Sequence, residues 1–450
     1  MGSTAAGRSQ SSRGPVDRRR LAGILVIAMS SAGAVGCGTS ADGGAASPEA
    51  WVGTIATEGD VTTVRNESGS VWGGPAALVE EASIGVEAGE DAYMLGRVVG
   101  VAAAADRIYV ADRQVPALRA YDWNGTWLQD FGRAGEGPGE FRYPAAVGVD
   151  GTGRVWLHDQ ISTRLTVFSA SGEPVATLSL GGVRISGTTG AMVVTEDGQA
   201  YVFDLIRLAA SADAGPVTSR RIMKPYDIDG VAGEPIEIPQ FDNPAYLEAE
   251  ATGVIRIAAI PFHPNGVTAF APTRGMLSGY PDAYRFEVRQ PDGKRTVIER
   301  AWEPVAVLPG EAAAHERAVT TYMRDLDPDW SWSGRTISAT KPAFSRFVPA
   351  VGGGVWVVRP GPATQDPDCD EADFEIDGEA HCWPQERIID AFDADGRYLG
   401  EVNVPTDLRF EPLPFIRGHD VIALTEDEAG TIRVKRYRLV PFGESLEQAP

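Results

Sequence analysis

Most hydrophobic residues of this chain fall into short runs that are separated by turn dipeptides. The runs 98–112 and 145–159 are followed by the shorter runs 118–122 and 164–168, and then by an Asn-Gly or a Ser-Gly pair. Apolar runs of this length indicate β-strands, and Asn-Gly readily adopts the positive φ of a tight hairpin. The pattern therefore predicts a chain built from short antiparallel strands.

The two segments repeat each other along the sequence. Asp112 and Asp159 are 47 residues apart, and Arg119 and Arg164 are 45 residues apart. A period near 45 with four short strands in each copy is typical of a propeller blade. Because one blade leaves an apolar face uncovered, several blades must surround a common axis.

Looser copies follow at 192–230, 284–293, 352–396 and 421–437, so the sequence predicts an all-β, six-bladed β-propeller with four-stranded blades. Two earlier stretches, 61–64 and 78–84, are expected to supply strands that close the ring against the last blade. The excess length is assigned to loop insertions. Residues 311–323 lack Gly and Pro and favour one short helical insertion that caps an edge of the ring.

The segment 131–144 combines a glycine-rich turn with Phe141 and Pro144. It resembles the inter-blade signature of NHL-repeat propellers. The chain is also similar to bacterial six-bladed propeller lipoproteins of unassigned activity, in which a signal peptide and a Val-Trp segment, here Val71-Trp72, precede the first blade. The resemblance covers most of 58–448, is strongest over 95–180, and implies a fold rather than an activity.

The first fifty residues differ in character from the rest. Arginines, an apolar stretch and small residues follow one another over 1–36, which is the order of a bacterial signal peptide. The run from Ala34 to Cys37 resembles a lipobox, so lipidation of Cys37 is expected; cleavage after Ala34, leaving a free thiol, is the alternative. The predicted organisation is a signal peptide (1–36), a lipid-anchored flexible tether (37–50) and the propeller (51–450).

Charge limits the partners of the folded part. The whole chain carries −22, and 1–36 hold five arginines and one aspartate, so the remainder carries −26. A body this acidic disfavours nucleic acid and anionic lipid surfaces. We therefore expect an exported cell-envelope protein that meets the membrane through its N-terminal lipid only, and a monomer.

The ends of the second strands provide a candidate binding face. In a propeller, the connections between blades and the loops after second strands open on the same side of the ring. Asp112, Asp159 and Asp204, with Arg113, Gln160 and Arg207 after them, should share this side with the 135–139 loop. Asp112, Arg113, Asp204 and Arg207 are thus candidate ligand-binding residues.

The repeated aspartates have a second interpretation. Aspartate commonly accepts hydrogen bonds from backbone N–H groups of its own turn, and a role repeated in several blades is usually structural. We favour that structural role. Arg119 and Arg164 recur within third strands and are expected to bridge neighbouring blades.

His158, adjacent to Asp159, is the best catalytic candidate among five histidines, although a lone strand histidine is more often packed in the core. None of the five forms a zinc-binding or serine-hydrolase motif. Some NHL-type propellers are metal-dependent lyases or lactonases, but no converging ligand set is apparent here. We predict no metal and no cofactor.

The remaining cysteines, Cys369 and Cys382, are expected to form a disulfide, which is stable in an exported protein. Around them Asp366, Asp368 and Asp370 imitate the start of a calcium loop. The sixth position of that loop is Glu371, where the sharp turn needs Gly, and the twelfth is not Glu. A solvated acidic loop is therefore favoured over calcium binding.

Together these features indicate a binding or scaffolding module for a protein, peptide or glycan in the cell envelope. The alternative is a propeller hydrolase or lyase that uses the Asp159/His158 face, with a divalent cation as an optional partner. A rigid structural component of an envelope assembly is the third interpretation.

Lipidation of Cys37 has a direct test. Globomycin, which blocks the lipoprotein signal peptidase, should make an unprocessed precursor accumulate on an immunoblot of expressing cells. Normal processing in the presence of globomycin would contradict the lipid anchor.

Overall fold

The computed structural model describes residues 49–104, 106–181, 192–207, 219–241, 246–271, 273–334, 336–373 and 376–444. The predicted signal peptide, Cys37 and most of the predicted tether lie outside these residues. Glu49 and Ala50, at the end of the predicted tether, already bond to Ser70.

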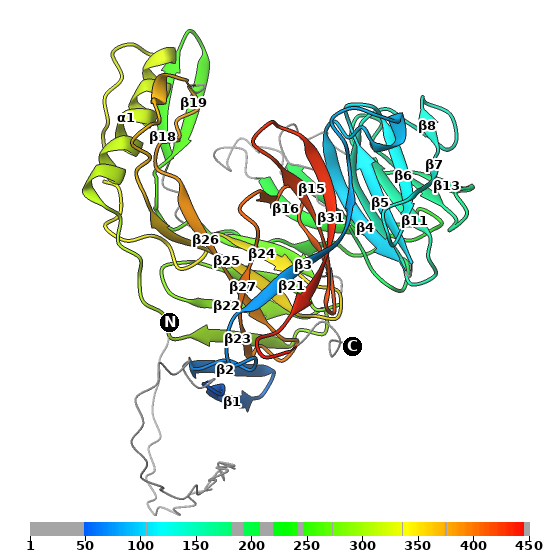
Figure 1. Ribbon diagram of the computed structural model, residues 1–450, viewed down its shortest axis with the longest axis horizontal. Helices are drawn as coiled ribbons and strands as arrows, with labels where there is room; N and C mark the ends of the chain where they lie inside the picture. The colour runs from blue at the N-terminus through cyan, green and yellow to red at the C-terminus, as the bar shows by residue number, and fades with distance from the viewer. Residues whose placement is uncertain are drawn as a thin grey trace, which may run out of the picture. The chain divides into compact units, whose positions relative to one another are not determined.

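The first three blades are antiparallel sheets in which neighbouring strands follow one another along the chain (Figure 1). Blade 1 holds β4 (Val98–Ala104), β5 (Arg107–Asp112), β6 (Ala117–Asp122) and β7 (Trp127–Phe131), and the short strands β8 (Arg133–Ala134) and β9 (Glu140–Phe141) pair in the connection to blade 2. Blade 2 holds β10 (Pro144–Val149), β11 (Val155–Asp159), β12 (Arg164–Phe168) and β13 (Pro174–Ser179). Blade 3 holds β14 (Met192–Val194), β15 (Ala200–Arg207), β16 (Ser219–Tyr226) and β17 (Ile236–Glu237).

The other three blades share strands with the N-terminal part of the chain. Blade 4 holds β20 (Val267–Ala271), β21 (Gly275–Gly279), β22 (Arg285–Arg289) and β23 (Arg295–Arg300). Blade 5 holds β24 (Arg346–Pro349), β25 (Val355–Ala363), β26 (Gln385–Phe392) and β27 (Tyr398–Asn403). Blade 6 holds β28 (Leu408–Arg409), β29 (Phe415–Arg417), β30 (Asp420–Glu426), β31 (Ile432–Val440) and, as its outer strand, β3 (Ala76–Ile84).

The prediction that 78–84 closes the ring is confirmed, because β3 pairs antiparallel with β31 over Ala77–Ile84. The same prediction for 61–64 is wrong. These residues belong to β2 (Val61–Ser68), which pairs in parallel with β23 of blade 4 and carries β1 (Val52–Glu58) on its outer edge. Tight packing against blade 4 explains this placement, since Val64 of β2 is fully buried.

Residues 50–84, which we term the N-terminal belt, thus run along the outer edges of three blades. Asn66 is buried in the belt and bonds two blades: its amide donates to the carbonyls of Glu299 in blade 4 and Gly396 in blade 5, and its oxygen accepts the Tyr398 N–H at 2.7 Å. Farther along, the N–H groups of Val71 and Trp72 donate to blade 5 carbonyls. The belt therefore ties blades 4, 5 and 6 together.

Buried apolar side chains pack between each pair of neighbouring blades. Each gap has its own cluster, for example Val98 with Ile422 between blades 6 and 1, Tyr109 with Phe168 between 1 and 2, Trp156 with Val202 between 2 and 3, Met223 with Phe270 between 3 and 4, Phe286 with Phe347 between 4 and 5, and Val358 with Tyr437 between 5 and 6. Six blades with six packed gaps form a closed ring.

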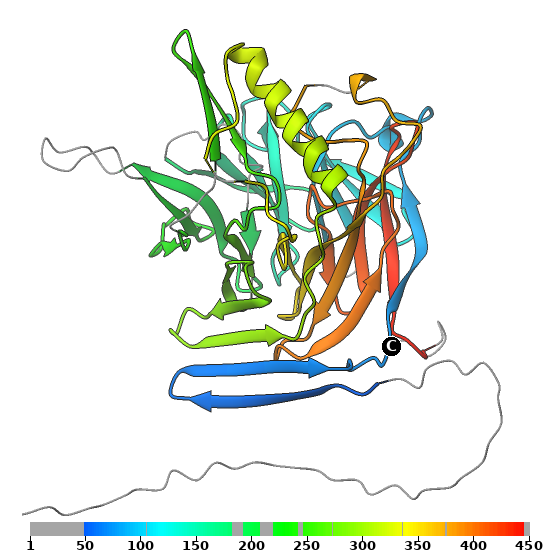
Figure 2. The ribbon, with the colours of Figure 1, turned by 90° about the vertical axis from the view of Figure 1, so that its left-hand side faces the viewer.

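Two insertions pack against each other outside the blades. The predicted helix is confirmed as α1 (Pro309–Leu326), and it lies on a hairpin of β18 (Tyr246–Ala251) and β19 (Val254–Ala259) (Figure 2). The sequence did not reveal this hairpin, and the prediction that the helix caps an edge of the ring is not confirmed, because the buried side chains of α1 pack on the hairpin instead. Short 3-10 turns at Asp91–Tyr93 and Glu371–Asp373 complete the described helices. Within the described chain no helix is long and apolar enough to span a membrane.

A buried ion pair joins the start of α1 to blade 5. The Lys341 ammonium lies 2.7 Å from the Glu311 carboxylate, and both side chains are fully buried. The ammonium also donates to the carbonyl of Gly361 on β25 and to the side chain of Gln385 on β26. Because each proton of the ammonium finds an acceptor, the charge is tolerated in the interior.

Lys341→Met should destabilise the protein by about 3–5 kcal/mol, since the Glu311 carboxylate would be buried without a counter-charge. Adding Glu311→Gln to this variant should recover part of the loss. Urea unfolding followed by tryptophan fluorescence measures both effects. Lys294→Met, which removes an exposed pair with Asp292, is the matched control and should leave stability unchanged. Equal effects of the two lysine variants would contradict the role of Lys341.

Candidate functional site

In blades 1 and 2 the inter-blade connection meets the end of the second strand. The Asp112 carboxylate, at the end of β5, is fully buried and accepts the N–H groups of Gly96 and Arg97, just before β4, and of Gln114. All of these donors belong to the backbone. The side chain of Asp112 therefore joins two loops of its own blade and faces no open site.

Asp159 does the same at the end of β11. It accepts the N–H groups of Arg142, Ile161 and Ser162, and also the Ser162 hydroxyl. Burial raises the pKa of this carboxyl, but the hydrogen bonds from Arg142 and Ser162 outweigh burial and hold the pKa below its usual value. This geometry matches the structural role that the repeat favoured.

The arginines of this face bind inter-blade connections. Arg113 donates to the Pro144 carbonyl at 3.0 Å, and its guanidinium stacks 4.2 Å from the centre of the Tyr143 ring. Arg119 donates to the Met94 carbonyl before blade 1, and Arg164 donates to the carbonyls of Glu136 and Glu140 between blades 1 and 2. Each of them holds a connection between blades in place.

The third copy is less completely described. The prediction that Asp204 ends the second strand and that Arg207 lies in the following loop is wrong, because β15 goes on pairing with β16 as far as Arg207. Asp204 lies half-buried inside β15, opposite Ile222 of β16. Arg207 ends β15, and its side chain lies outside the described residues. The structure therefore brings Asp112, Arg113 and Asp159 to one face of the ring without gathering them around a cavity.

His158 is a core residue. It shares one face of β11 with Trp156, which packs between blades 2 and 3, and only 8% of its surface is exposed. Burial lowers the pKa of His158 to about 4, so the imidazole is neutral at physiological pH. Asp159 points to the opposite face of the strand, where it accepts hydrogen bonds from its own turn, so the two side chains do not converge.

The disulfide between Cys369 and Cys382 is present in the long loop of blade 5. Asp366 and Asp370 accept backbone N–H groups two residues later, as turn aspartates do, and Glu371 accepts the N–H groups of His381 and Cys382. Asp377, Glu379 and His381 gather on the surface of the same loop, with ligand atoms within 4.8 Å of one another. The Asp377 carboxylate is already engaged by the His381 ring at 2.9 Å.

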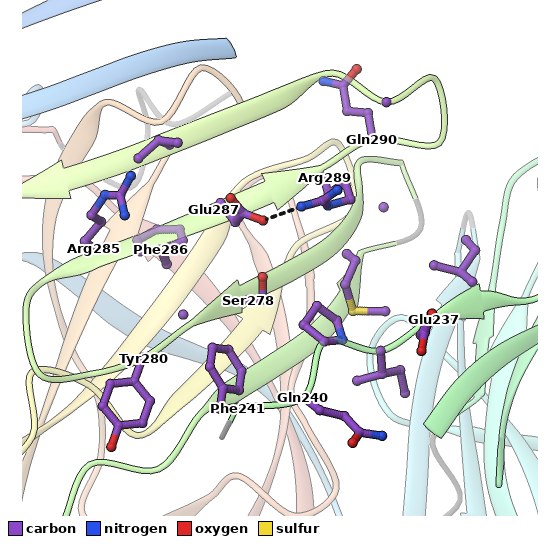
Figure 3. A pocket seen from close by; sticks show the side chains of 18 of the residues that line it. Glu237, Gln240, Phe241, Ser278, Tyr280, Arg285, Phe286, Glu287, Arg289 and Gln290 are labelled. Carbon is purple, nitrogen blue, oxygen red and sulfur yellow. Dashed lines mark hydrogen bonds and ion pairs between the residues drawn. The ribbon is translucent and has the colours of Figure 1, made fainter. Parts of the chain in front are cut away.

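A groove of about 1040 Å³ opens instead between blades 3 and 4 (Figure 3). Its cause is the fourth strand of blade 3, because β17 has only two residues where β13 and β23 have six. A blade with so short an outer strand does not cover the face of its neighbour. The outer half of blade 4 is therefore left open toward blade 3, and we term this space the blade 3–4 groove.

Register explains which side chains line the groove. On β22 the residues Arg285, Glu287 and Arg289 point into it, and β21 places Met276 and Ser278 opposite Arg289 and Glu287. On the other wall, β17 and the segment after it contribute Glu237, Ile238 and Gln240. The floor is apolar and the walls are charged.

The charges of the groove alternate in sign. Glu287 lies 3.1 Å from Arg289 and 3.6 Å from Arg295, while Glu237 lies 3.7 Å from Arg220. All these side chains are at least partly exposed. Exposed pairs of this kind contribute little to stability, so they remain available to a ligand.

An aromatic pair marks the end of the groove that lies nearest the second-strand loop of blade 4. The rings of Phe241 and Tyr280 lie 5.9 Å apart, and Figure 3 shows both beside Gln240 and Ser278. Phe241 is seated against Gly266, where any Cβ would come within 1.8 Å of the ring. The backbone of Gly266 thus fixes the position of this aromatic side chain.

The groove was not predictable from the sequence. The alternation of charged and apolar residues over 285–289 was readable and indicates a strand with one polar face. The shortness of β17 was not readable, because Ile236–Glu237 resembles many other apolar and polar pairs in the loops. A strand this short leaves no motif in the sequence.

Titration of His158 predicts how stability depends on pH. The unfolded chain binds a proton at this side chain near pH 6.5, whereas the folded chain binds it near 4, so acid favours unfolding between these values. His158→Leu should remove a stability loss on the order of 3 kcal/mol between pH 7 and 4. Urea unfolding of the wild type and the variant between pH 4 and 7 measures this difference. An equal dependence of the free energy of unfolding on pH in both proteins would contradict the lowered pKa of His158.

The comparison with protein families supports this fold. A family model described as a 6-bladed β-propeller matches residues 88–214, and no curated protein matches the chain in sequence. Among solved structures, the chain is similar to a member of the DUF4221 family from Bacteroides vulgatus, at 9% identity and a TM-score of 0.44, covering 82% of this chain and 99% of that one. It is also similar to a Bacteroides fragilis protein that is described as exported, at 9% identity and a TM-score of 0.43, covering 84% of this chain and 99% of that one. A third is a streptogramin B lyase, at 9% identity and a TM-score of 0.34, covering 80% and 97%. The closed ring and the family model identify the chain as a six-bladed β-propeller.

Proposed function

We propose that this propeller is an exported, lipid-anchored binding module that holds an extended peptide segment of a cell-envelope protein in the blade 3–4 groove. The observation that carries the proposal is the composition of the groove, in which exposed arginines and carboxylates alternate above an apolar floor. Three properties of the groove support a peptide over the other ligand classes.

The first property is length. From Arg285 to Arg289 the β22 strand extends about 13 Å, which matches about four residues of an extended chain. The groove volume of about 1040 Å³ lies at the upper end of the range for ligand sites. A short peptide segment, lying along β22, fits this space.

The second property is the mixture of charges. Peptides present both ammonium and carboxylate groups, and the arginines and glutamates of the groove offer a partner to each. A polyanion would meet Glu237, Asp282 and Glu287 within the groove and a body of −26 around it. A neutral glycan has no charged group that could pair with these arginines and glutamates.

The third property is the aromatic end. Phe241 and Tyr280 form a platform for one apolar side chain, with Met276 and Ile238 in the floor behind them. Aromatic residues of this kind supply most of the affinity at binding sites, because they bury a large area and lose little side-chain freedom.

Export and anchoring rest on the leader sequence. A lipid on Cys37 would place twelve residues, 37–48, between the membrane and the first described residue. A segment of that length reaches up to about 40 Å when extended, enough for the groove to meet envelope proteins near the membrane.

A random twelve-residue peptide library on phage tests the proposal. Peptides selected on the purified wild-type protein should be measured by fluorescence anisotropy against Tyr280→Ala and Arg289→Glu. The first variant removes half of the aromatic platform, and the second replaces a cation of the wall by an anion. Both should weaken binding at least about tenfold while circular dichroism stays unchanged.

Arg133→Glu is the matched control. Arg133 is an exposed arginine with a single carboxylate partner, Glu140, and it lies outside the groove between blades 1 and 2. This variant should bind the selected peptides as the wild type does. Equal loss in Arg133→Glu and Arg289→Glu, or binding that ignores all three variants, would refute a peptide site in the groove.

A further inference from the structure

The outward face of the β18–β19 hairpin is a second surface with unusual exposure. On β19, Ile255 is 60% exposed and Ile257 is 53% exposed, and Tyr246 at the start of β18 is about as open. Exposed large apolar side chains that are grouped on one face, rather than scattered, mark interaction sites.

The inward face of the same hairpin is covered except at its tip, where Val254 is 54% exposed. Leu247 and Ala249 of β18 are buried against Val319 and Met323 of α1. Within the described residues no other strand pairs with β18 or β19. The hairpin is thus a two-stranded sheet with a helix on one face and solvent on the other (Figure 2).

The outward face combines an apolar row with an acidic row. The register sets Glu248 opposite Ile257 and Glu250 opposite Ile255, with the carboxylates on β18 and the isoleucines on β19. The one arginine of the hairpin, Arg256, belongs to the other face, where it binds the Tyr322 carbonyl and Asp325 of α1. A complementary partner therefore needs apolar side chains beside basic ones.

This chemistry argues against two other occupants. A second copy of the hairpin would set carboxylates against carboxylates, or would bury them on isoleucines, and both arrangements are unfavourable. A membrane surface would bring Glu248 and Glu250 toward anionic headgroups, with the same result. A basic protein segment has neither disadvantage.

We propose that the outward face of β18–β19 docks an amphipathic helix of a protein partner, with its apolar stripe on the Ile255 and Ile257 row and its lysines or arginines against Glu248 and Glu250. Two strands lie about 4.8 Å apart, and a helix about 10 Å wide spans both rows. The helix α1 already packs in this way on the inward face. The docked helix completes a helix–sheet–helix sandwich, and it is independent of the blade 3–4 groove.

Two synthetic helical peptides of 18 residues test the proposal on the full exported chain. Both carry leucines along one stripe, and they differ only in having lysine or glutamate beside it. By fluorescence anisotropy the lysine peptide should bind at least about tenfold tighter than the glutamate peptide. Hydrogen exchange should slow at 246–259 when the lysine peptide is bound.

Variants of the two rows separate this surface from general charge attraction. The double variant Glu248→Lys/Glu250→Lys should reverse the preference between the peptides. The double variant Ile255→Asn/Ile257→Asn should abolish binding. Ile55→Asn is the matched control, because Ile55 is 50% exposed but belongs to β1.

Four results would overturn the proposal. No binding of the lysine peptide would do so, and so would an unchanged preference in the lysine double variant, which would indicate attraction to the acidic body as a whole. A wild-type dimer that Ile255→Asn dissociates would identify a second copy as the occupant. Binding to phosphatidylglycerol vesicles that Ile255→Asn abolishes would identify a lipid surface.

Discussion

Backbone pairing between β3 and β31 joins the start of the described chain to its end, and each of the six inter-blade cores relies on that closure. Blade 6 has no outer strand of its own, so β3 supplies it. The N-terminal belt reaches β3 by first passing blades 4 and 5, where Asn66 bonds to both. One segment, 50–84, therefore both closes the ring and extends the sheet of blade 4. This segment precedes the first blade in the sequence.

The same arrangement explains why the candidate site lies between blades 3 and 4. The belt covers the outer edge of blade 4, because β2 pairs with β23, whereas the outer strand of the neighbouring blade 3 is only Ile236–Glu237. The groove lies where the complete blade 4 faces this incomplete outer edge. The carboxylates at the ends of the second strands, by contrast, already accept hydrogen bonds from the N–H groups of the loops.

Much of the fold was predictable because repetition is visible in sequence. The spacing of Asp112 and Asp159 predicted blades, and the absence of Gly and Pro over 311–323 predicted α1. The structural role of these aspartates was predictable as well. The partner of 61–64 was not, since a strand that pairs 234 residues away, as Arg65 does with Glu299, depends on tertiary packing alone. The groove was hidden for the same reason: it results from a strand that is too short, and the exposed face of β18–β19 lies in the part of the chain with the weakest repeat.

A crystal structure of the protein with a peptide selected from the random library tests the peptide site in the blade 3–4 groove most directly. If the blade 3–4 groove is the binding site, the peptide lies extended along β22 between Arg285 and Arg289, with an apolar side chain on Phe241 and Tyr280. A peptide seated elsewhere on the ring, for instance on the second-strand loops near Asp112 and Asp159, would contradict it.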